Sequence, residues 1–316
     1  MVGRAEIQAA ADRIGGSICR TPLLRTDLGR PGAPLFVKAE CLQFGGSFKL
    51  RGALNAVALL GPDERARGVV THSSGNHAKA LARAASAAGI RATIVMPAQA
   101  PEVKRLATLA QGASVVLVDM ADREAAVAAI QADTGAVFIP PYDDPAIIAG
   151  QGTVGLEILA DLPDLSTVLV PVSGGGLVSG VAVAIKAQLP GSRVVAVEPE
   201  LAGDLADGFS SGERVVWDTA LTGRTIADGL RTACVGELNW RHIQALVDDV
   251  ITVTDDEIRS AMRAVVLGAR LVCEPSGAVA VAGFRAHPEV VGPGPTVAVV
   301  SGGNVSPDLL REVLAT

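Results

Sequence analysis

The sequence predicts an α/β protein whose parallel sheets are covered by helices on both faces. From residue 68 onwards, short runs rich in Val, Ile and Ala alternate with helix-forming segments, a pattern typical of parallel sheets. Hydrophobic residues make up 49% and charged residues 19% of the 316 residues, which is ample for a buried core. A chain of this length suggests about two domains.

The first half of the chain predicts two helices and then one small sheet. An amphipathic helix is expected at residues 1–16, and a Gly-Gly-Ser turn at residues 45–47 leads into a second helix that begins near Phe48. Four short units between about residues 68 and 141 are compact enough for a single open sheet. Its expected strands are 68–74, 91–97, 113–118 and 136–140, and its expected helices are 76–89, 101–112 and 122–135.

The second half predicts a larger sheet, which the chain reaches through a crossing segment at residues 140–148. Thr254 and Glu257 have the spacing of a capping box, which marks the start of a helix. We therefore expect a large domain of residues 1–48 and 146–316 and a small domain of residues 49–145. The other expected elements are helix 152–162, strand 166–172, helix 174–191, strand 192–199 and a final strand at 296–303.

Composition excludes several classes of function. The formal net charge is -6, the pI is about 5.3 and aromatic residues make up only 3%, so neither nucleic acid nor an anionic membrane is an expected partner. No apolar run approaches the roughly 20 residues that span a bilayer. The first residues carry charges throughout, unlike a signal peptide, and the four widely spaced cysteines fit a reducing compartment. We expect a soluble cytoplasmic protein.

Three glycine-containing turns follow strands, where α/β sheets bind their ligands. They are "SSGNH" at 73–77, "VSGGGLVSG" at 172–180 and "SGGN" at 301–304. The first alone could be an N-cap cluster and the third an ordinary turn. The second has three adjacent glycines, which let backbone N–H groups converge on an anion, so it predicts a phosphate site.

Lys49 is unusual because it lies in the first turn of a helix, where the helix dipole disfavours a cation. Partial burial would lower its pKa and favour the neutral, nucleophilic amine; the alternative is a solvated structural lysine. A dinucleotide site built from Gly174, Gly176, Gly180 and Glu198 is a rival interpretation of the glycine turn, but it leaves Lys49 unexplained. Pyridoxal phosphate explains both features, because it needs an amine, a phosphate cradle and partners for its ring.

The motifs "GGSFKLRGA", "SSGNHAKALA", "SGGGLVSG", "EPSGAVAVAG" and "SGGN", in this order, resemble those of fold-type II pyridoxal-phosphate enzymes. Within that class the chain resembles the serine/threonine dehydratases and serine racemases from about Thr21 to Asn304. The resemblance implies a fold like that of the tryptophan synthase β subunit, with two open, twisted, mainly parallel sheets flanked by helices. It also implies a cofactor-binding large domain, a small domain that closes over the substrate, and a homodimer.

The resemblance implies a role for each residue of these motifs. Lys49 matches the Schiff-base lysine, Phe48 the residue beside the cofactor ring, and Asn76 the donor to its phenolic oxygen. Ser301 matches the partner of the pyridine nitrogen, and Glu274 matches an acidic residue that either tunes the ring or caps a helix. The implied phosphate loop consists of Ser173, Gly174, Gly175, Gly176 and Leu177, and the implied substrate carboxylate site consists of Ser73, Ser74, Asn76 and His77.

Two positions depart from the family pattern, and one further site is implied. Ser173 stands where the family often has a fourth glycine, and Gly45 replaces a common threonine. In racemase-like members Glu198, Asp204 and the carbonyl of Ala202 match an oxygen-ligand site for Mg²⁺ or Ca²⁺. Without the resemblance both carboxylates would be solvated loop charges.

The implied reaction is β-elimination of water from L-threonine or L-serine, giving a 2-oxo acid and ammonia. A hydroxyl such as that of Ser301 does not keep the pyridine nitrogen protonated, which favours prompt elimination over a long-lived carbanion. Ser74 either binds the carboxylate or exchanges a proton on the face opposite the lysine, as in racemases. Serine racemase, a dehydratase of 3-hydroxyaspartate or phenylserine, and a cofactor-free amino-acid sensor remain alternatives. A feedback-regulatory domain is not expected, because the chain ends about a dozen residues after "SGGN".

Overall fold

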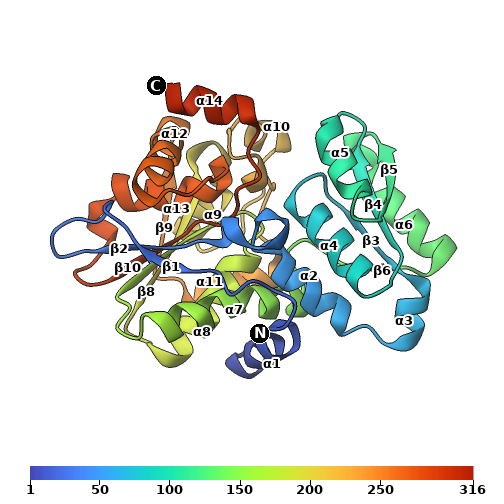
Figure 1. Cartoon of the computed structure of the whole chain (residues 1–316), viewed down its shortest axis with the longest axis horizontal. Coiled ribbons are helices and arrows are strands. Elements are labelled where there is room, and N and C mark those ends of the chain that lie inside the picture. The colour runs from blue at the N-terminus through green and yellow to red at the C-terminus, as the bar shows by residue number, and fades with distance from the viewer. Residues whose placement is uncertain (316) are drawn as a thin grey trace.

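The computed structural model describes residues 1–315, which form two sheets side by side (Figure 1). The larger sheet has six strands in the order β1-β2-β10-β7-β8-β9. Only β1 runs antiparallel to its neighbour, so the prediction of a mainly parallel sheet is confirmed. Its strands are β1 (Leu23–Arg25), β2 (Leu35–Lys38), β7 (Thr167–Pro171), β8 (Arg193–Pro199), β9 (Asp249–Val253) and β10 (Thr296–Val299).

The smaller sheet is entirely parallel and has the order β5-β4-β3-β6. It is formed by the four units that the sequence predicts between residues 68 and 141. The strands are β3 (Val69–His72), β4 (Ala92–Pro97), β5 (Ser114–Val118) and β6 (Val137–Phe138). The helices around it are α2 (Lys49–Ala58), α3 (Pro62–Arg67), α4 (Asn76–Ala87), α5 (Glu102–Leu109) and α6 (Arg123–Thr134).

Helices cover both faces of the larger sheet (Figure 1). On one side lie α1 (Arg4–Ile14), α7 (Pro145–Asp161), α8 (Gly176–Gln188) and α11 (Glu237–Leu246). On the other side lie α12 (Asp255–Ala264), α13 (Pro275–Ala286) and α14 (Pro307–Ala315). The short helices α9 (Asp204–Ser211) and α10 (Thr219–Thr222) belong to the connection between β8 and β9.

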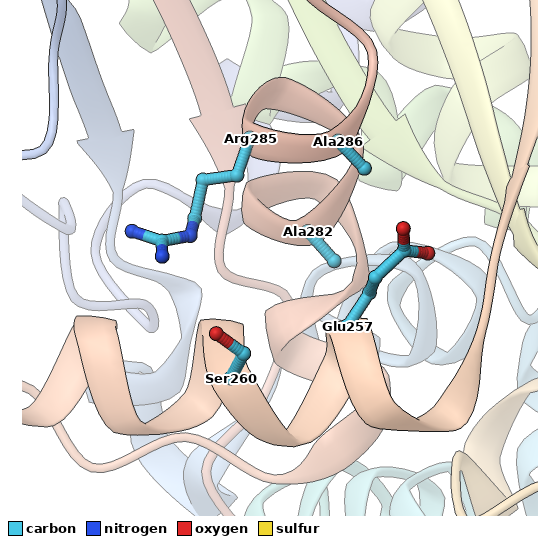
Figure 2. A pocket seen from close by; sticks show the side chains of 5 residues that line it. All are labelled: Glu257, Ser260, Ala282, Arg285 and Ala286. Carbon is cyan, nitrogen blue, oxygen red and sulfur yellow. The ribbon is translucent and has the colours of Figure 1, made fainter.

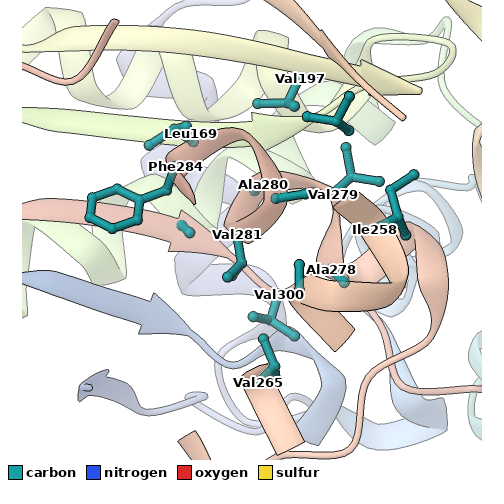
Figure 3. Packing of buried hydrophobic residues seen from close by; sticks show 14 of the residues in the cluster. Leu169, Val197, Ile258, Val265, Ala278, Val279, Ala280, Val281, Phe284 and Val300 are labelled. Carbon is teal, nitrogen blue, oxygen red and sulfur yellow. The ribbon is translucent and has the colours of Figure 1, made fainter. Parts of the chain in front are cut away.

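The main core lies where α12 and α13 pack on the larger sheet (Figure 3). Strand residues such as Leu169 and Val197 meet Val279 and Phe284 of α13 there, and all four are at most 2% exposed. Small and branched side chains dominate this core. They allow a helix to approach the sheet closely, as continuous apolar strands buried on both faces require.

One helix starts earlier than the sequence predicts. The expected helix 152–162 is the second part of α7, which begins at Pro145. Asp144 accepts hydrogen bonds from Ala146 N at 2.7 Å and Ile147 N at 3.1 Å, and proline suits the first helical position. Only residues 139–144 connect β6 to α7. The division into domains at residues 48 and 145 stays a prediction.

Among residues 1–315, no helix is both long and apolar enough to cross a membrane.

Candidate active site

Lys49 begins α2 directly after a turn in which Gly45 and Gly46 have φ of +79° and +80°. Its Nζ donates a hydrogen bond of 2.7 Å to the carbonyl of Pro141 and lies 5.2 Å from the centre of the Phe48 ring. Loss of water around the amine lowers the pKa of Lys49 to about 8, because desolvation disfavours the ammonium form. Lys49 is half-buried, and with this pKa a sizeable fraction of its amine is neutral near physiological pH.

The glycine loop, residues 173–177, lies beside Pro141 and Tyr142, and the Pro141 carbonyl accepts the hydrogen bond from Lys49. Gly175 has φ of +91° and precedes α8, whose first N–H groups have no partner within the helix. A Cβ at Gly174 would lie 2.2 Å from the ring of Tyr142, and one at Gly176 would lie 3.1 Å from the Tyr142 carbonyl oxygen. Because Tyr142 follows the carbonyl that accepts from Lys49, the loop and the amine line one site.

Hydrogen bonds from distant segments hold this loop in place. The carbonyl of Gly174 accepts from Asn239 Nδ2 at 2.7 Å and from Gly236 N at 3.0 Å. The hydroxyl of Ser173 lies 2.7 Å from that of Thr232, while Leu177 is buried in the core. With its carbonyls and side chains engaged in this way, the loop can direct backbone N–H groups to a phosphate, so residues 173–177 fit the cofactor.

Asn76, Glu274 and Ser301 also come together. Asn76 is the first residue of α4, and its Nδ2 donates to Glu274 Oε1 at 2.6 Å. Glu274 occupies the N-cap position of α13, yet its side chain makes no capping hydrogen bond. Burial, with a smaller contribution from Asp228, raises the pKa of Glu274 to about 7. The Ser301 carbonyl accepts from Phe48 N at 3.1 Å, and its hydroxyl donates to the Ser276 carbonyl at 3.3 Å.

The loop expected to bind a carboxylate lies between β3 and α4. Ser73 Oγ accepts from Gly75 N at 3.2 Å, and Ser74 is half-buried. His77 is buried, and its Nε2 lies 3.1 Å from the carbonyl oxygen of Ile139. Burial, together with the nearby Lys49 charge, lowers the pKa of His77 to about 3. The imidazole is thus neutral, and the roles of these four residues stay predictions.

The two carboxylates among the expected metal ligands, Glu198 and Asp204, lie near one another. Glu198 and Asp204 are 0% and 2% exposed, which excludes the alternative of solvated loop charges. Burial raises the pKa of Glu198, and the Asp204 carboxylate raises it further. Glu198 Oε2 accepts from Ala206 N at 2.9 Å, but Oε1 has no hydrogen-bond partner among the described residues. The two carboxylates supply oxygen ligands of the kind that a hard cation prefers, but among the described residues no group of three or more His, Cys, Asp or Glu side chains is placed to hold a metal ion.

The sequence did not reveal a buried ionic cluster next to the site. Arg51, two residues after Lys49, is 0% exposed and forms double hydrogen bonds with two carboxylates. Its Nε donates to Glu40 Oε2 at 2.8 Å and its Nη1 to Glu157 Oε1 at 2.7 Å. Lys38 Nζ donates to Glu157 Oε2 at 2.5 Å. The cluster ties the start of α2 to α7 and to the segment after β2.

Tyr142 is a second residue that sequence reasoning missed. It lies in the crossing segment, where no periodic pattern marks a side chain as buried or exposed. One available signal was that it is the only tyrosine in the chain. Burial raises the pKa of Tyr142 to about 12, so its phenol is neutral.

A separate small pocket of about 170 Å³ lies between α12 and α13. Figure 2 shows Glu257 and Ser260 on α12 and Ala282, Arg285 and Ala286 on α13. The carboxylate of Glu257 already accepts from Thr254 N at 2.8 Å, which confirms the expected capping box. The lining of this pocket includes no lysine that could form a Schiff base with pyridoxal phosphate.

A lysine with a lowered pKa beside a glycine loop, with the loop at the end of a parallel strand, is the arrangement expected of a pyridoxal-phosphate enzyme. A family model described as "Pyridoxal-phosphate dependent enzyme" matches residues 14–302. The chain belongs to this family and has its fold-type II architecture.

Within this family the chain is similar to proteins named serine racemase and threonine dehydratase. A serine racemase of Arabidopsis thaliana is 44% identical over 308 residues, which cover 95% of this chain and 92% of the relative. The catabolic L-threonine dehydratase of Escherichia coli (strain K12) is 41% identical over 312 residues, covering 97% and 93%. The structure of maize serine racemase superimposes with a TM-score of 0.92 at 39% identity, covering 99% of this chain and 97% of the other.

Proposed function

We propose that this protein is a pyridoxal-phosphate-dependent ammonia-lyase that removes water from L-threonine or L-serine. The products would be a 2-oxo acid and ammonia. The observation that carries the proposal is the Lys49 amine, which has a lowered pKa and lies beside the 173–177 loop. The names of the E. coli dehydratase and of the plant racemases support a β-hydroxy amino acid as the substrate.

Lys49 and the N–H groups at the start of α8 would have different roles in the reaction. Lys49 would hold the cofactor and, when released, take the α-proton of the substrate; the pKa of its amine, about 8, suits a base near neutral pH. The N–H groups at the start of α8 would bind the cofactor phosphate. Bound pyridoxal phosphate supplies the electron-withdrawing ring that acidifies the α-hydrogen.

The substrate carboxylate would lie on the 73–77 loop. The hydroxyls of Ser73 and Ser74 and the N–H groups at the start of α4 are donors there. His77, kept neutral by its burial, would act as a hydrogen-bonding group and not as a cation.

Three further features are part of the proposal. Glu198, Asp204 and the Ala202 carbonyl would hold Mg²⁺ or Ca²⁺ in a structural or activating role. The smaller sheet would move as a closing domain, and Lys104 of α5 would help to hold the closed state through its 2.6 Å ion pair with Asp228. The protein would act as a cytoplasmic homodimer.

The experiment is a panel of β-hydroxy amino acids, including both enantiomers of serine and threonine and 3-hydroxyaspartate, with and without Mg²⁺. Formation of 2-oxo acid and ammonia from L-threonine or L-serine would support the proposal. Protein that binds the cofactor but releases no 2-oxo acid from any member of the panel would refute it.

Serine racemase activity is the second candidate, because relatives named serine racemase are up to 44% identical to this chain and the resemblance implies Ser74 as a second proton donor and acceptor. We predict that Ser74→Ala slows conversion of L-serine to D-serine about a hundredfold or more, since a positioned acid–base group contributes about 10²–10⁴-fold to the rate. Dehydration of L-serine should fall much less, because Lys49 takes the proton there. Both rates are measured on the same sample, and equal losses would leave Ser74 as a carboxylate ligand only.

A further inference from the structure

The Asn76 side chain belongs to a chain of hydrogen bonds that starts at a lysine and ends at a carboxylate. Lys79 Nζ donates to Asn304 Oδ1 at 3.2 Å, and Asn304 Nδ2 donates to Asn76 Oδ1 at 2.8 Å. Asn76 Nδ2 then donates to Glu274 Oε1 at 2.6 Å. Lys79 lies one turn after Asn76 on α4, whereas Asn304 follows β10 and Glu274 precedes α13. The hydrogen bonds therefore connect the two sheets.

The Lys79 end of this series of hydrogen bonds fixes the direction of every bond, because an ammonium group only donates. Asn304 must present its oxygen to Lys79 and its NH₂ group to Asn76, which in turn must present its NH₂ group to Glu274. The second amide hydrogen of Asn304 is directed to the Gly45 carbonyl oxygen, with Nδ2 2.9 Å from that oxygen. Asn76 is therefore left with one amide hydrogen that these bonds do not use.

Glycines make room for this arrangement. A Cβ at Gly302 would lie 2.1 Å from Glu274 Oε1 and 3.3 Å from Asn76 Nδ2. A Cβ at Gly46 would lie 2.7 Å from Asn304 Oδ1. Gly302 and Asn304 belong to the "SGGN" turn and Gly46 to the turn before Lys49, so both turns leave space for the same side chains.

We propose that Lys79 and Asn304 are positioning residues that orient the Asn76 amide, so that its remaining N–H faces the phenolic oxygen of the cofactor. This inference rests on the proposed binding of pyridoxal phosphate. An N–H group stabilises the ionised phenolic oxygen, whereas the carbonyl oxygen of a flipped amide would repel it. Lys79 and Asn304 thereby act on the ionisation state of the cofactor without contacting it.

The test compares the absorption bands of the bound cofactor at one pH and at saturating cofactor. The ratio measured is that of the form with an ionised phenolic oxygen to the form with a protonated one. Lys79→Met and Asn304→Asp should lower this ratio roughly tenfold, the effect of losing a hydrogen bond to a charged group. Lys79→Arg, which keeps the donor and the charge, should restore it.

Lys186→Met is the matched control. Lys186 is also a partly buried lysine, and it donates to the Ser192 carbonyl and to Asp248 at 2.8 Å each, but it lies on α8. We expect no change in the band ratio for this variant. The thermal unfolding midpoint of each protein without cofactor reports whether the fold is kept.

The outcomes separate this inference from the proposed function. A wild-type protein that does not bind the cofactor would refute the proposed function. Cofactor bound with the same band ratio in Lys79→Met and Asn304→Asp as in the wild type would overturn the positioning role alone. The same fall in Lys79→Arg as in Lys79→Met would also overturn it. If Lys79→Met fails to fold, the band ratio of the isosteric Asn304→Asp variant tests the positioning role alone.

Discussion

At the scale of single residues, the proposed chemistry depends on the amine of Lys49. The pKa of a lysine in water is about 10.4, and the loss of water around this amine lowers it to about 8. The only polar contact of Nζ among the described residues is the Pro141 carbonyl at 2.7 Å. A carbonyl accepts from either form of the amine and does not hold the proton as a carboxylate would.

We predict that cofactor capture by the unloaded protein rises with pH and is half-maximal near pH 8. The neutral amine is the form that attacks an aldehyde, and it becomes the majority form above the pKa of Lys49. Stopped-flow absorbance across pH 6–10, corrected with a simple amine for ionisation of the cofactor itself, measures this dependence. A rate that still rises steeply beyond pH 9.5 would show that Lys49 keeps an ordinary pKa.

Gly174 shows why bare glycine is needed in the loop. The ring of Tyr142 packs where a Cβ would stand, at a distance of 2.2 Å. The sequence predicts a phosphate cradle from the three glycines, but the contact with Tyr142 adds a second reason for one of them. That contact joins positions 32 residues apart, so no local pattern could reveal it.

At the scale of elements, the start of α2 is held by the Arg51 cluster. Arg51 links Glu40 before α2 to Glu157 on α7, with all donor–acceptor distances to these carboxylates between 2.7 and 2.9 Å. Breaking a buried pair leaves a carboxylate without its counter-charge, which is far more costly than losing a surface pair. The cluster thus fixes the helix that carries Lys49.

We expect Arg51→Met to lower the free energy of unfolding by about 3–5 kcal/mol. Arg20→Met is the matched control, because the Arg20–Asp161 pair spans 2.5 Å but the Arg20 side chain is 58% exposed. Loss of such a surface pair costs about 0–1 kcal/mol. Urea unfolding of the three proteins gives both values, and similar losses in the two variants would count against a stabilising role of the buried cluster.

The sequence predicts elements well where a long pattern or a cap marks them. The alternating strands and helices of the smaller sheet and the capping box of α12 are confirmed. Strands β1 and β2 are too short for a periodic pattern to reveal them. Helix α7 begins earlier than the sequence predicts, because Asp144 caps it and Pro145 is its first residue, within a segment whose sequence resembles a loop. The contacts of Arg51 with Glu157 and of Asn76 with Glu274 and Asn304 could not be predicted, since these partners lie about 100 to 230 residues away along the chain.

At the scale of the whole molecule, the site lies where the two sheets meet. Lys49, Asn76 and Lys79 belong to helices of the smaller sheet, while the glycine loop, Glu274 and Asn304 follow or flank strands of the larger one. A change in the angle between the sheets would therefore alter the site itself. Glu198 lies near the carboxyl end of β8 and Asp204 begins α9, so a cation bound by this pair would act on the larger sheet.

We predict that Mg²⁺ or Ca²⁺ raises the thermal unfolding midpoint of the wild-type protein, because a ligand that binds only the folded state stabilises it by about 2.7 kcal/mol at 100 times its Kd. Asp204→Asn should abolish this increase. Glu200→Gln should keep it, since Glu200 is an exposed carboxylate in the same turn. Scanning fluorimetry with and without the cation gives the comparison, and an equal increase in all three proteins would place the cation elsewhere.

The central claim is that Lys49 carries the cofactor beside the 173–177 loop. The most direct test is to load the protein with pyridoxal phosphate, reduce it with borohydride, digest it and locate the label by mass spectrometry. The account predicts one pyridoxyl group per chain on the peptide that contains Lys49, and none in a Lys49→Ala protein. A label on a different lysine, or no label on active protein, would contradict it.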